Sequence, residues 1–162
     1  MAANTTFVSG AILTAAQMNA LPWGIVDATA GGTSGRGWIA RNSANFTMTT
    51  TLTDVTSMTV TFTPVTGRLY RATFVARAAN VSTAQNVLTK ITDGSNVVKS
   101  TLYSYMISTG DATIYNSVIL TGLSGSTTLK VRAQCGTASN AILVGDSETS
   151  YTFSVEDIGP SA

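Results

Sequence analysis

Carboxylates are the main side chains in this chain that could do acid-base chemistry, because histidine is absent from its 162 residues. The eight acids are Asp27, Asp54, Asp93, Asp111, Asp146, Glu148, Glu156 and Asp157. Without histidine, neither a Ser-His-Asp triad nor a Cys-His pair can form. A zinc site needs several Cys or His ligands, and Cys135 is the only cysteine. Triad-type and zinc-dependent hydrolysis are therefore disfavoured.

Two carboxylate functions remain to be weighed: glycoside hydrolysis and calcium binding. A glycosidase needs two acids flanking the scissile bond, but most acids here fall in turn sequences, where aspartate is favoured for its local hydrogen bonds. Asp111, Asp146 and Glu148 would bind calcium only if their loops converged, and their spacing matches no calcium loop. The sequence therefore predicts no enzyme, no cofactor and no metal. A small hydrolase is the least favoured alternative.

Two further motifs favour structural interpretations. The segment Gly31-Gly-Thr-Ser-Gly-Arg-Gly37 lacks the Gly-Lys-Ser/Thr ending of a phosphate-binding loop, and no predicted strand and helix frame it. We therefore interpret residues 28–36 as a flexible, glycine-rich joint. Cys135 falls on the apolar face of an alternating run, which predicts a buried and inert thiol.

The composition is that of a neutral, compact domain. Only 10% of residues are charged, the formal net charge is +1 and 44% of residues are hydrophobic. Nucleic-acid binding needs clustered Lys and Arg, whereas the nine cations here are scattered. No apolar run approaches the roughly 20 residues that span a bilayer, and the first residues do not resemble a signal peptide. We therefore expect neither nucleic acid nor membrane as a partner.

Alternating apolar and polar residues predict that the elements carrying these side chains are strands. Met58, Val60 and Phe62 share one face of such a run, and the sequence Asp93-Gly-Ser-Asn96 has the composition of a hairpin turn. Strands are predicted near residues 37–41, 46–52, 56–63, 68–79, 86–92, 97–108, 112–121, 126–135, 141–144 and 151–157. Many short strands separated by turns indicate an antiparallel β-sandwich of the jelly-roll type over residues 37–162.

The N-terminal segment, residues 1–27, is predicted to be an anchor that contains the chain's one short helix. Thr14 and Gln17 have capping-box spacing, and Pro22 limits the helix to about residues 15–20. A helix of this length is not stable alone, and the segment is rich in apolar residues that would form an association site if exposed. The predicted particle-anchoring residues are Phe7, Ile12, Leu13, Met18, Leu21, Trp23, Ile25 and Val26.

Three tyrosines leave alternatives open. Tyr103, Tyr105 and Tyr115 could lie in the core, in a subunit interface or on a saccharide-contacting face. Core or interface is favoured, since aromatic residues dominate both. The Thr-rich, lysine-poor strands also have weak protection against edge-to-edge pairing, which favours closure into an oligomer.

Three segments carry a resemblance to a known family. They are the N-terminal Phe7-Val-Ser-Gly-Ala-Ile-Leu-Thr-Ala-Ala-Gln-Met-Asn-Ala-Leu-Pro22-Trp-Gly-Ile-Val26, the central Gly67-Arg-Leu-Tyr-Arg-Ala-Thr-Phe74 and the C-terminal Phe153-Ser-Val-Glu-Asp-Ile-Gly-Pro160. Together they resemble segments of small virion proteins of tailed bacteriophages, of the minor tail, tail-fibre and head-decoration types. The resemblance implies a jelly-roll module, commonly trimeric, without enzymatic activity.

The expected function is therefore that of a non-enzymatic virion protein, assembled in the host cytoplasm and displayed on the capsid as a decoration or head-fibre protein. Its expected partners are further copies of itself, as a trimer, and the major capsid protein or another virion protein. The alternative is a minor tail or tail-tip fibre subunit whose jelly roll binds a host surface glycan or another receptor.

Overall fold

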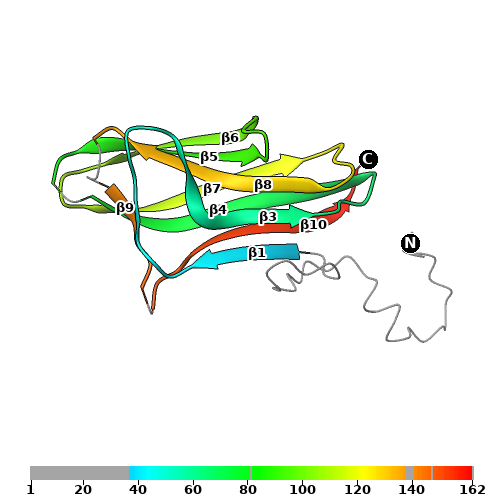
Figure 1. The fold of residues 1–162 in the computed structure, drawn as a ribbon, viewed down its shortest axis with the longest axis horizontal. Helices are drawn as coiled ribbons and strands as arrows, with labels where there is room; N and C mark the ends of the chain where they lie inside the picture. Colours follow the sequence, from blue (N-terminus) through cyan, green and yellow to red (C-terminus); the bar gives the residue numbers. More distant parts are fainter. Residues whose placement is uncertain (1–36, 81, 138–140, 147, 162) are drawn as a thin grey trace.

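The computed structural model describes residues 37–80, 82–137, 141–146 and 148–161, and this part of the chain is all-β (Figure 1). Its strands are β1 (Gly37–Asn42), β2 (Phe46–Thr47), β3 (Thr53–Phe62), β4 (Arg68–Asn80), β5 (Gln85–Asp93), β6 (Val98–Met106), β7 (Asp111–Leu120), β8 (Thr127–Cys135), β9 (Ala141–Leu143) and β10 (Tyr151–Pro160). The predicted helix, the anchor over residues 1–27 and the joint over residues 28–36 lie outside the described residues.

The strands form two antiparallel sheets that pack face to face. Long strands of the first sheet follow the order β1-β10-β4-β7, and the short strands β9 and β2 extend this sheet beside the end of β4. The second sheet has the order β3-β8-β5-β6. The pairing is nested: β1 with β10, β3 with β8, β4 with β7 and β5 with β6. A doubled chain rolled into two layers in this way is a jelly roll, so the predicted fold is confirmed.

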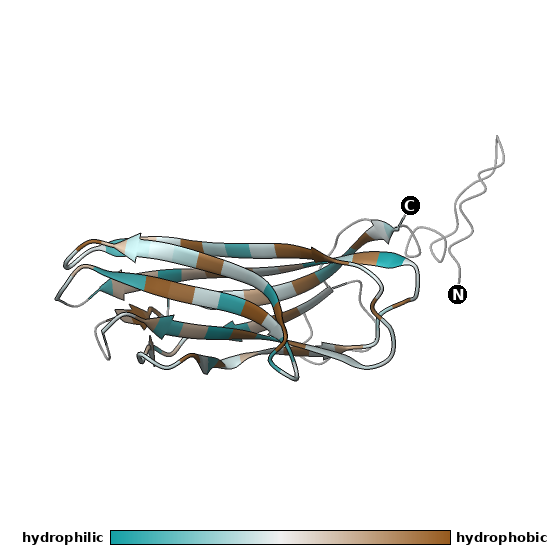
Figure 2. Cartoon of the chain, turned by 90° about the horizontal axis from the view of Figure 1, so that it is seen from above, coloured by the Kyte–Doolittle hydropathy of each residue, from teal (hydrophilic) through white to brown (hydrophobic). Residues whose placement is uncertain are grey.

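Alternation places the core between the sheets, as expected for half-buried strands. Figure 2 shows apolar and polar residues alternating along the strands. Phe74 and Phe153 are fully buried and directly opposite each other on β4 and β10. On β8, alternate residues from Leu129 to Cys135 are buried, so the prediction of a buried thiol at Cys135 is confirmed.

Turns follow the local chemistry of their residues. The hairpin between β5 and β6 is confirmed: the Asp93 carboxylate accepts backbone N–H groups from Ser95 and Val97, at 3.0 and 2.9 Å. Asn96 has a φ of 69°, a left-handed conformation that asparagine tolerates. At the other end of the sandwich, the buried side chains of Asn80 and Gln85 hydrogen-bond to each other and to neighbouring loops.

The structure corrects three predicted boundaries. The strand expected over residues 46–52 is only two residues long, because Met48 and Thr49 instead hydrogen-bond to Ala141 and Cys135 from a connecting segment. Strand β3 begins at Thr53 rather than near residue 56, and its register with β8 shifts between Asp54 and Thr59. Strand β10 continues to Pro160, because a bulge after Asp157 lets its pairing with β4 resume.

Candidate association surface

The three candidate tyrosines are on the surface of the chain. Tyr103, Tyr105 and Tyr115 are 69%, 67% and 59% exposed, so the alternative that they lie in the core is wrong. A role in a subunit interface or in adhesion stays a prediction. The predicted anchor residues all lie outside the described part of the chain.

The exposed tyrosines lie on two strands that form neighbouring edges of the sandwich. In the described residues, β6 pairs only with β5, and β7 pairs only with β4. The residues 107–110 connect β6 directly to β7 and bring the two edges to the same side of the molecule (Figure 1). We call this side, with Tyr103, Tyr105, Ile107, Tyr115 and Ile119, the β6–β7 side.

A buried polar network holds these two edges together across the gap between the sheets. Asn116 on β7 is 3% exposed. Its side-chain amide donates to the carbonyl oxygen of Thr89 on β5, at 3.2 Å, and its Oδ1 accepts from Ser100 on β6, at 2.5 Å. Because a buried amide must be hydrogen-bonded, these contacts fix how β6 and β7 lie relative to each other.

Apolar side chains flank both edges on the outer faces of the sheets. Tyr103 lies directly opposite Leu88 on β5, and Leu88 is only 6% exposed although it lies on the outer face. Tyr115 lies opposite Val75 on β4, which is 37% exposed, and Ile119 is 58% exposed. Neighbouring side chains on one sheet face interact as cross-strand pairs. The β6–β7 side therefore carries an apolar strip on each outer face.

Sequence reasoning missed Ile107, Ile119 and Leu88 as members of this surface. The exposed isoleucines follow the alternation of their strands, but period-2 alternation does not say which face is the core in an apolar strand such as 112–121. Leu88 sits in a strand that is buried on both faces, from Val87 to Thr89. One feature of the sequence could have indicated this surface: Asp111 is the only charged residue between Lys99 and Lys130, the stretch that contains most of β6 and all of β7.

Charges on the remaining outer surface are largely paired within the chain. Arg68 pairs with Asp157, Arg71 with Glu156, Arg77 with Asp111 at 2.5 Å, and Lys99 with Asp93 at 3.1 Å. The hydrogen bonds that Arg68 and Arg71 donate to these carboxylates raise the pKa of both guanidinium groups. These contacts leave few cations for an outside anion.

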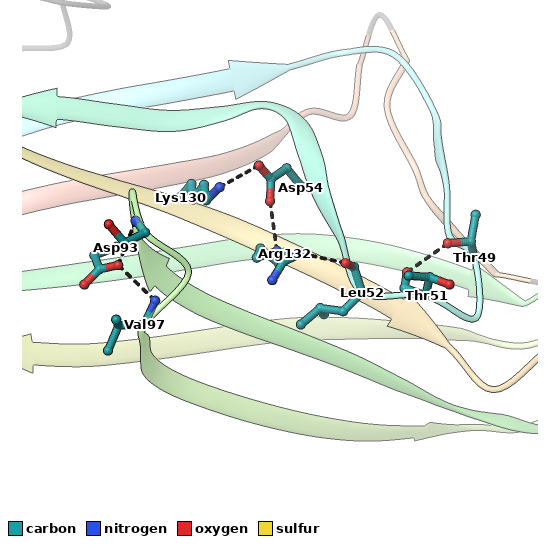
Figure 3. A network of polar contacts seen from close by, with 9 residues as sticks. Thr49, Thr51, Leu52, Asp54, Asp93, Val97, Lys130 and Arg132 are labelled. Carbon is teal, nitrogen blue, oxygen red and sulfur yellow. Dashed lines mark hydrogen bonds and ion pairs between the residues drawn. The ribbon is translucent and has the colours of Figure 1, made fainter.

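A second charged group lies on the outer face of β3 and β8 (Figure 3). Asp54 accepts from Lys130 at 2.7 Å and lies 2.9 Å from Nε of Arg132, whose guanidinium also donates to the carbonyl oxygen of Leu52. The hydrogen bond from Lys130 is the largest cause that lowers the pKa of the Asp54 carboxyl. Asp54 itself is half-exposed, and its contacts with Lys130 and Arg132 join β3 to β8.

Two of the acids considered for calcium binding, Asp111 and Asp146, have separate partners within the chain. The Asp146 carboxylate accepts the backbone N–H groups of Thr149 and Glu148, at 2.5 and 2.9 Å, and the Thr149 contact is the largest cause that lowers its pKa. Asp111 contacts Arg77. Within the described residues, no three metal-ligating side chains of the His, Cys, Asp or Glu type lie together. No described helix is long and apolar enough to span a bilayer.

Opposite the β6–β7 side, the edges β1 and β3 lie together and are filled by aromatic rings. Trp38 and Phe62 have ring centroids 4.4 Å apart, and Phe62 and Tyr70 are 5.3 Å apart. We call these two edges with their three rings the β1–β3 side. A groove of about 390 Å³ runs between residues 38–41 and the β3 residues Ser57 and Thr59–Thr61.

Comparison with known proteins identifies no family for the chain. No family model matches it, and no curated protein matches it. Among solved structures, one of infectious bursal disease virus strain Gx aligns with a TM-score of 0.41 and 8% identity, covering 79% of this chain and 39% of that one. Dimeric latent PorU from Porphyromonas gingivalis aligns with a TM-score of 0.40 and 10% identity, covering 82% and 14%. The chain thus spans well under half of either protein, and likenesses this distant carry no functional argument.

Proposed function

We propose that the chain is a non-enzymatic structural protein of a bacteriophage particle, displayed on the capsid surface as a decoration or head-fibre protein. Residues 1–27 attach it to the major capsid protein or another virion protein, and the jelly roll faces solvent. The proposal includes self-association, for which the family resemblance implies a trimer.

One observation carries this proposal: the two family-like segments within the described residues form a single structural unit. Gly67–Phe74 and Phe153–Pro160 lie on the adjacent antiparallel strands β4 and β10, which pair from Phe74 opposite Phe153 to Arg68 opposite Pro160 with a bulge after Asp157. The charged residues of one motif pair with those of the other, as Arg71 does with Glu156. Gly67 has a φ of 77°, which favours glycine, and its carbonyl oxygen accepts the N–H of Ser161. The two segments that carry the resemblance are therefore neighbours in the fold although they are far apart in sequence.

Two properties of the surface support a display role. The net charge of +1, and the pairing of most arginines with acids over the described residues, do not favour binding of nucleic acid. Several acids are held by cations or turn amides, and histidine is absent, so a catalytic acid-base pair has little support. Both properties suit a protein that acts through its shape and contacts.

Binding to purified particles tests the proposal. The full chain should bind particles that lack it, whereas the double variant Leu13→Ser, Trp23→Ser should lose binding while its far-UV circular dichroism is unchanged. Val65→Ser, at a 55% exposed loop position of the jelly roll, is the matched control and should bind fully. Full decoration by the double variant would overturn the anchor assignment. Electron microscopy of decorated particles separates a capsid from a tail location.

A second candidate function is a tail-tip or fibre subunit that binds a host surface glycan or receptor. It is favoured by the exposed ring faces of Tyr103 and Tyr105, since aromatic faces bury large apolar area at binding surfaces. Glycan binding that is lost in Tyr103→Ala and kept in Val65→Ser would support it. Absence of binding to a broad glycan panel and to host cells would count against it.

A further inference from the structure

The edge strands of the β6–β7 side are long, and no strand of the described residues pairs with their outer side. Strand β6 has nine residues and β7 has ten. In any edge strand, alternate residues direct backbone N–H and C=O groups away from the sheet, and these groups can pair with another strand. The chemistry that fits such an edge is therefore an extended polypeptide.

Over most of their length these edges lack the devices that protect β3: on β6 a register shift with β5 and the charge of Lys99 are confined to its first residues, and pairing is regular from Ser100 to Met106. Strand β3 has a register shift between Asp54 and Thr59, a left-handed residue at Ser57 and the charge of Asp54. Strand β7 pairs with β4 without interruption from Asp111 to Leu120 and carries no charge after its first residue. Bulges and charges are the features that block edge-to-edge pairing, so the β6–β7 side is the side open to it.

The area and apolar character of the β6–β7 side suit a stable interface. At their exposed fractions, the three tyrosines with Ile107 and Ile119 present roughly 500 Å² of side-chain surface. When both sheets continue, part of this surface is covered, because the side chains of one edge strand lie beside those of the other copy as cross-strand pairs, and the backbone of two strand edges is covered as well. The strips lie on both outer faces, so a partner that extends only one sheet would leave the other strip uncovered.

The distribution of charge leaves the middle of this side free of charged residues on β6 and β7. Lys99 lies at the start of β6 and Asp111 at the start of β7, which is the opposite end of the edge pair because the two strands are joined by residues 107–110. A twofold axis perpendicular to the sheets reverses the strand direction. It keeps the like-charged ends of the two copies apart and brings no charged residue of β6 or β7 to the middle, while Lys99 and Asp111 stay paired with Asp93 and Arg77 of their own chain.

We propose that a second copy of the chain binds the β6–β7 side around such a twofold axis. Strand β6 pairs with β6 of the other copy and β7 with its β7, both antiparallel, so that both sheets continue across the interface. The inference specifies the self-association within the proposed function and does not depend on the virion location. It gives a dimer, and a trimer implied by the resemblance would need another contact.

Sedimentation of the full chain tests the dimer. The wild-type protein should sediment at twice the 16.7 kDa of one chain. Tyr103→Glu places two like charges beside the axis, since residue 103 is next to the middle of β6, and should weaken dimerisation at least about 100-fold. Thr59→Glu adds the same charge at an exposed position of β3, the other edge of the same sheet, and should leave the dimer unchanged. A wild-type monomer, or a trimer that tolerates Tyr103→Glu, would overturn the proposal.

A charge-swap experiment tests the twofold arrangement itself. The Tyr103→Glu and Tyr103→Lys variants should each be monomeric, and mixing them should restore a dimer, because only a twofold contact brings residue 103 of one copy to residue 103 of the other. Failure to associate on mixing, with both variants folded by circular dichroism, would contradict the axis.

Tyr115→Ser, at an exposed position on β7, tests the same interface without adding charge. Its dimer should be weakened about tenfold. Particle binding through residues 1–27 is measured separately, so either proposal can fail alone.

Discussion

The two open sides of the jelly roll are built in opposite ways. On the β1–β3 side, Trp38, Phe62 and Tyr70 are buried and stack between the edges. On the β6–β7 side, a buried amide, Asn116, spans the gap, and the tyrosines stand outside. The β1–β3 side is thus completed by the chain's own aromatic rings. The other is closed by hydrogen bonds and keeps its aromatic surface available for a partner.

Removing an aromatic ring from the β1–β3 side should have the largest effect on stability. Phe62 is 4% exposed and contacts both other rings. Phe62→Ala leaves a cavity in this cluster and should lower the free energy of unfolding by about 3–5 kcal/mol, measured by urea denaturation. The dimer measured by sedimentation should persist under native conditions. A variant of unchanged stability that no longer dimerises would reverse the roles of the two sides.

Removing the amide that spans the β6–β7 side should have an intermediate effect. Asn116→Ala leaves Ser100 and Thr89 without their partner and should cost about 1–3 kcal/mol of stability. It should also weaken self-association, because the two edges lose their fixed spacing. Thr73→Ala breaks a hydrogen bond to Ser117 on the outer face between β4 and β7 and serves as control. Equal effects of the two variants on self-association would argue against a special role for Asn116.

Alkaline conditions should weaken the β1–β3 side. Tyr70 is 1% exposed, and burial is the main cause that raises its pKa above the ordinary value of 10.0. A raised folded-state pKa contributes stability that is full below pH 10.0 and is lost as pH rises towards that pKa. The wild-type protein should therefore lose stability above pH 10.0, and Tyr70→Phe should lose less over the same range. Thermal melts across this range measure both, and identical slopes would contradict the prediction.

The smallest effect is expected at the charged group on β3. The lowered pKa of Asp54 contributes stability above its ordinary value of 3.8, and this is lost as pH falls further. Because the carboxylate is half-exposed, Asp54→Asn should cost about 0.2–1 kcal/mol at neutral pH. The difference from wild type should shrink below pH 3.8 in urea titrations. A loss of several kcal/mol would mean that the β3 edge depends on this carboxylate much more than its exposure indicates.

The fold class could be predicted because alternation and turn residues, the features that indicate strands and hairpins, are local in the sequence. Alternation at Met58, Val60 and Phe62 identified a strand and its buried face, and Asp93 identified a hairpin. Register is not local: the shift between Asp54 and Thr59 depends on β8, which lies far along the chain. Each strand can therefore be predicted from its own sequence, but the strands that pair with it cannot.

The candidate surface was predicted in part, for a related reason. Tyr103, Tyr105 and Tyr115 were identified by residue type, but whether they lay inside or outside depended on which strands became edges. The pairing of β4 with β10 brought two family-like motifs together, and neither motif alone predicts its partner. The place of Ile119 in this surface depends on β7 being an edge strand, which its own sequence does not show.

Amide hydrogen exchange of the full chain at low and high protein concentration tests the central claim most directly. If a second copy covers the β6–β7 side, peptides from β6 and β7 should exchange more slowly at high concentration, while peptides from β1 and β3 should be unchanged. Protection that increases on β1 and β3 instead, or on none of these strands, would contradict the assignment of the β6–β7 side as the association surface.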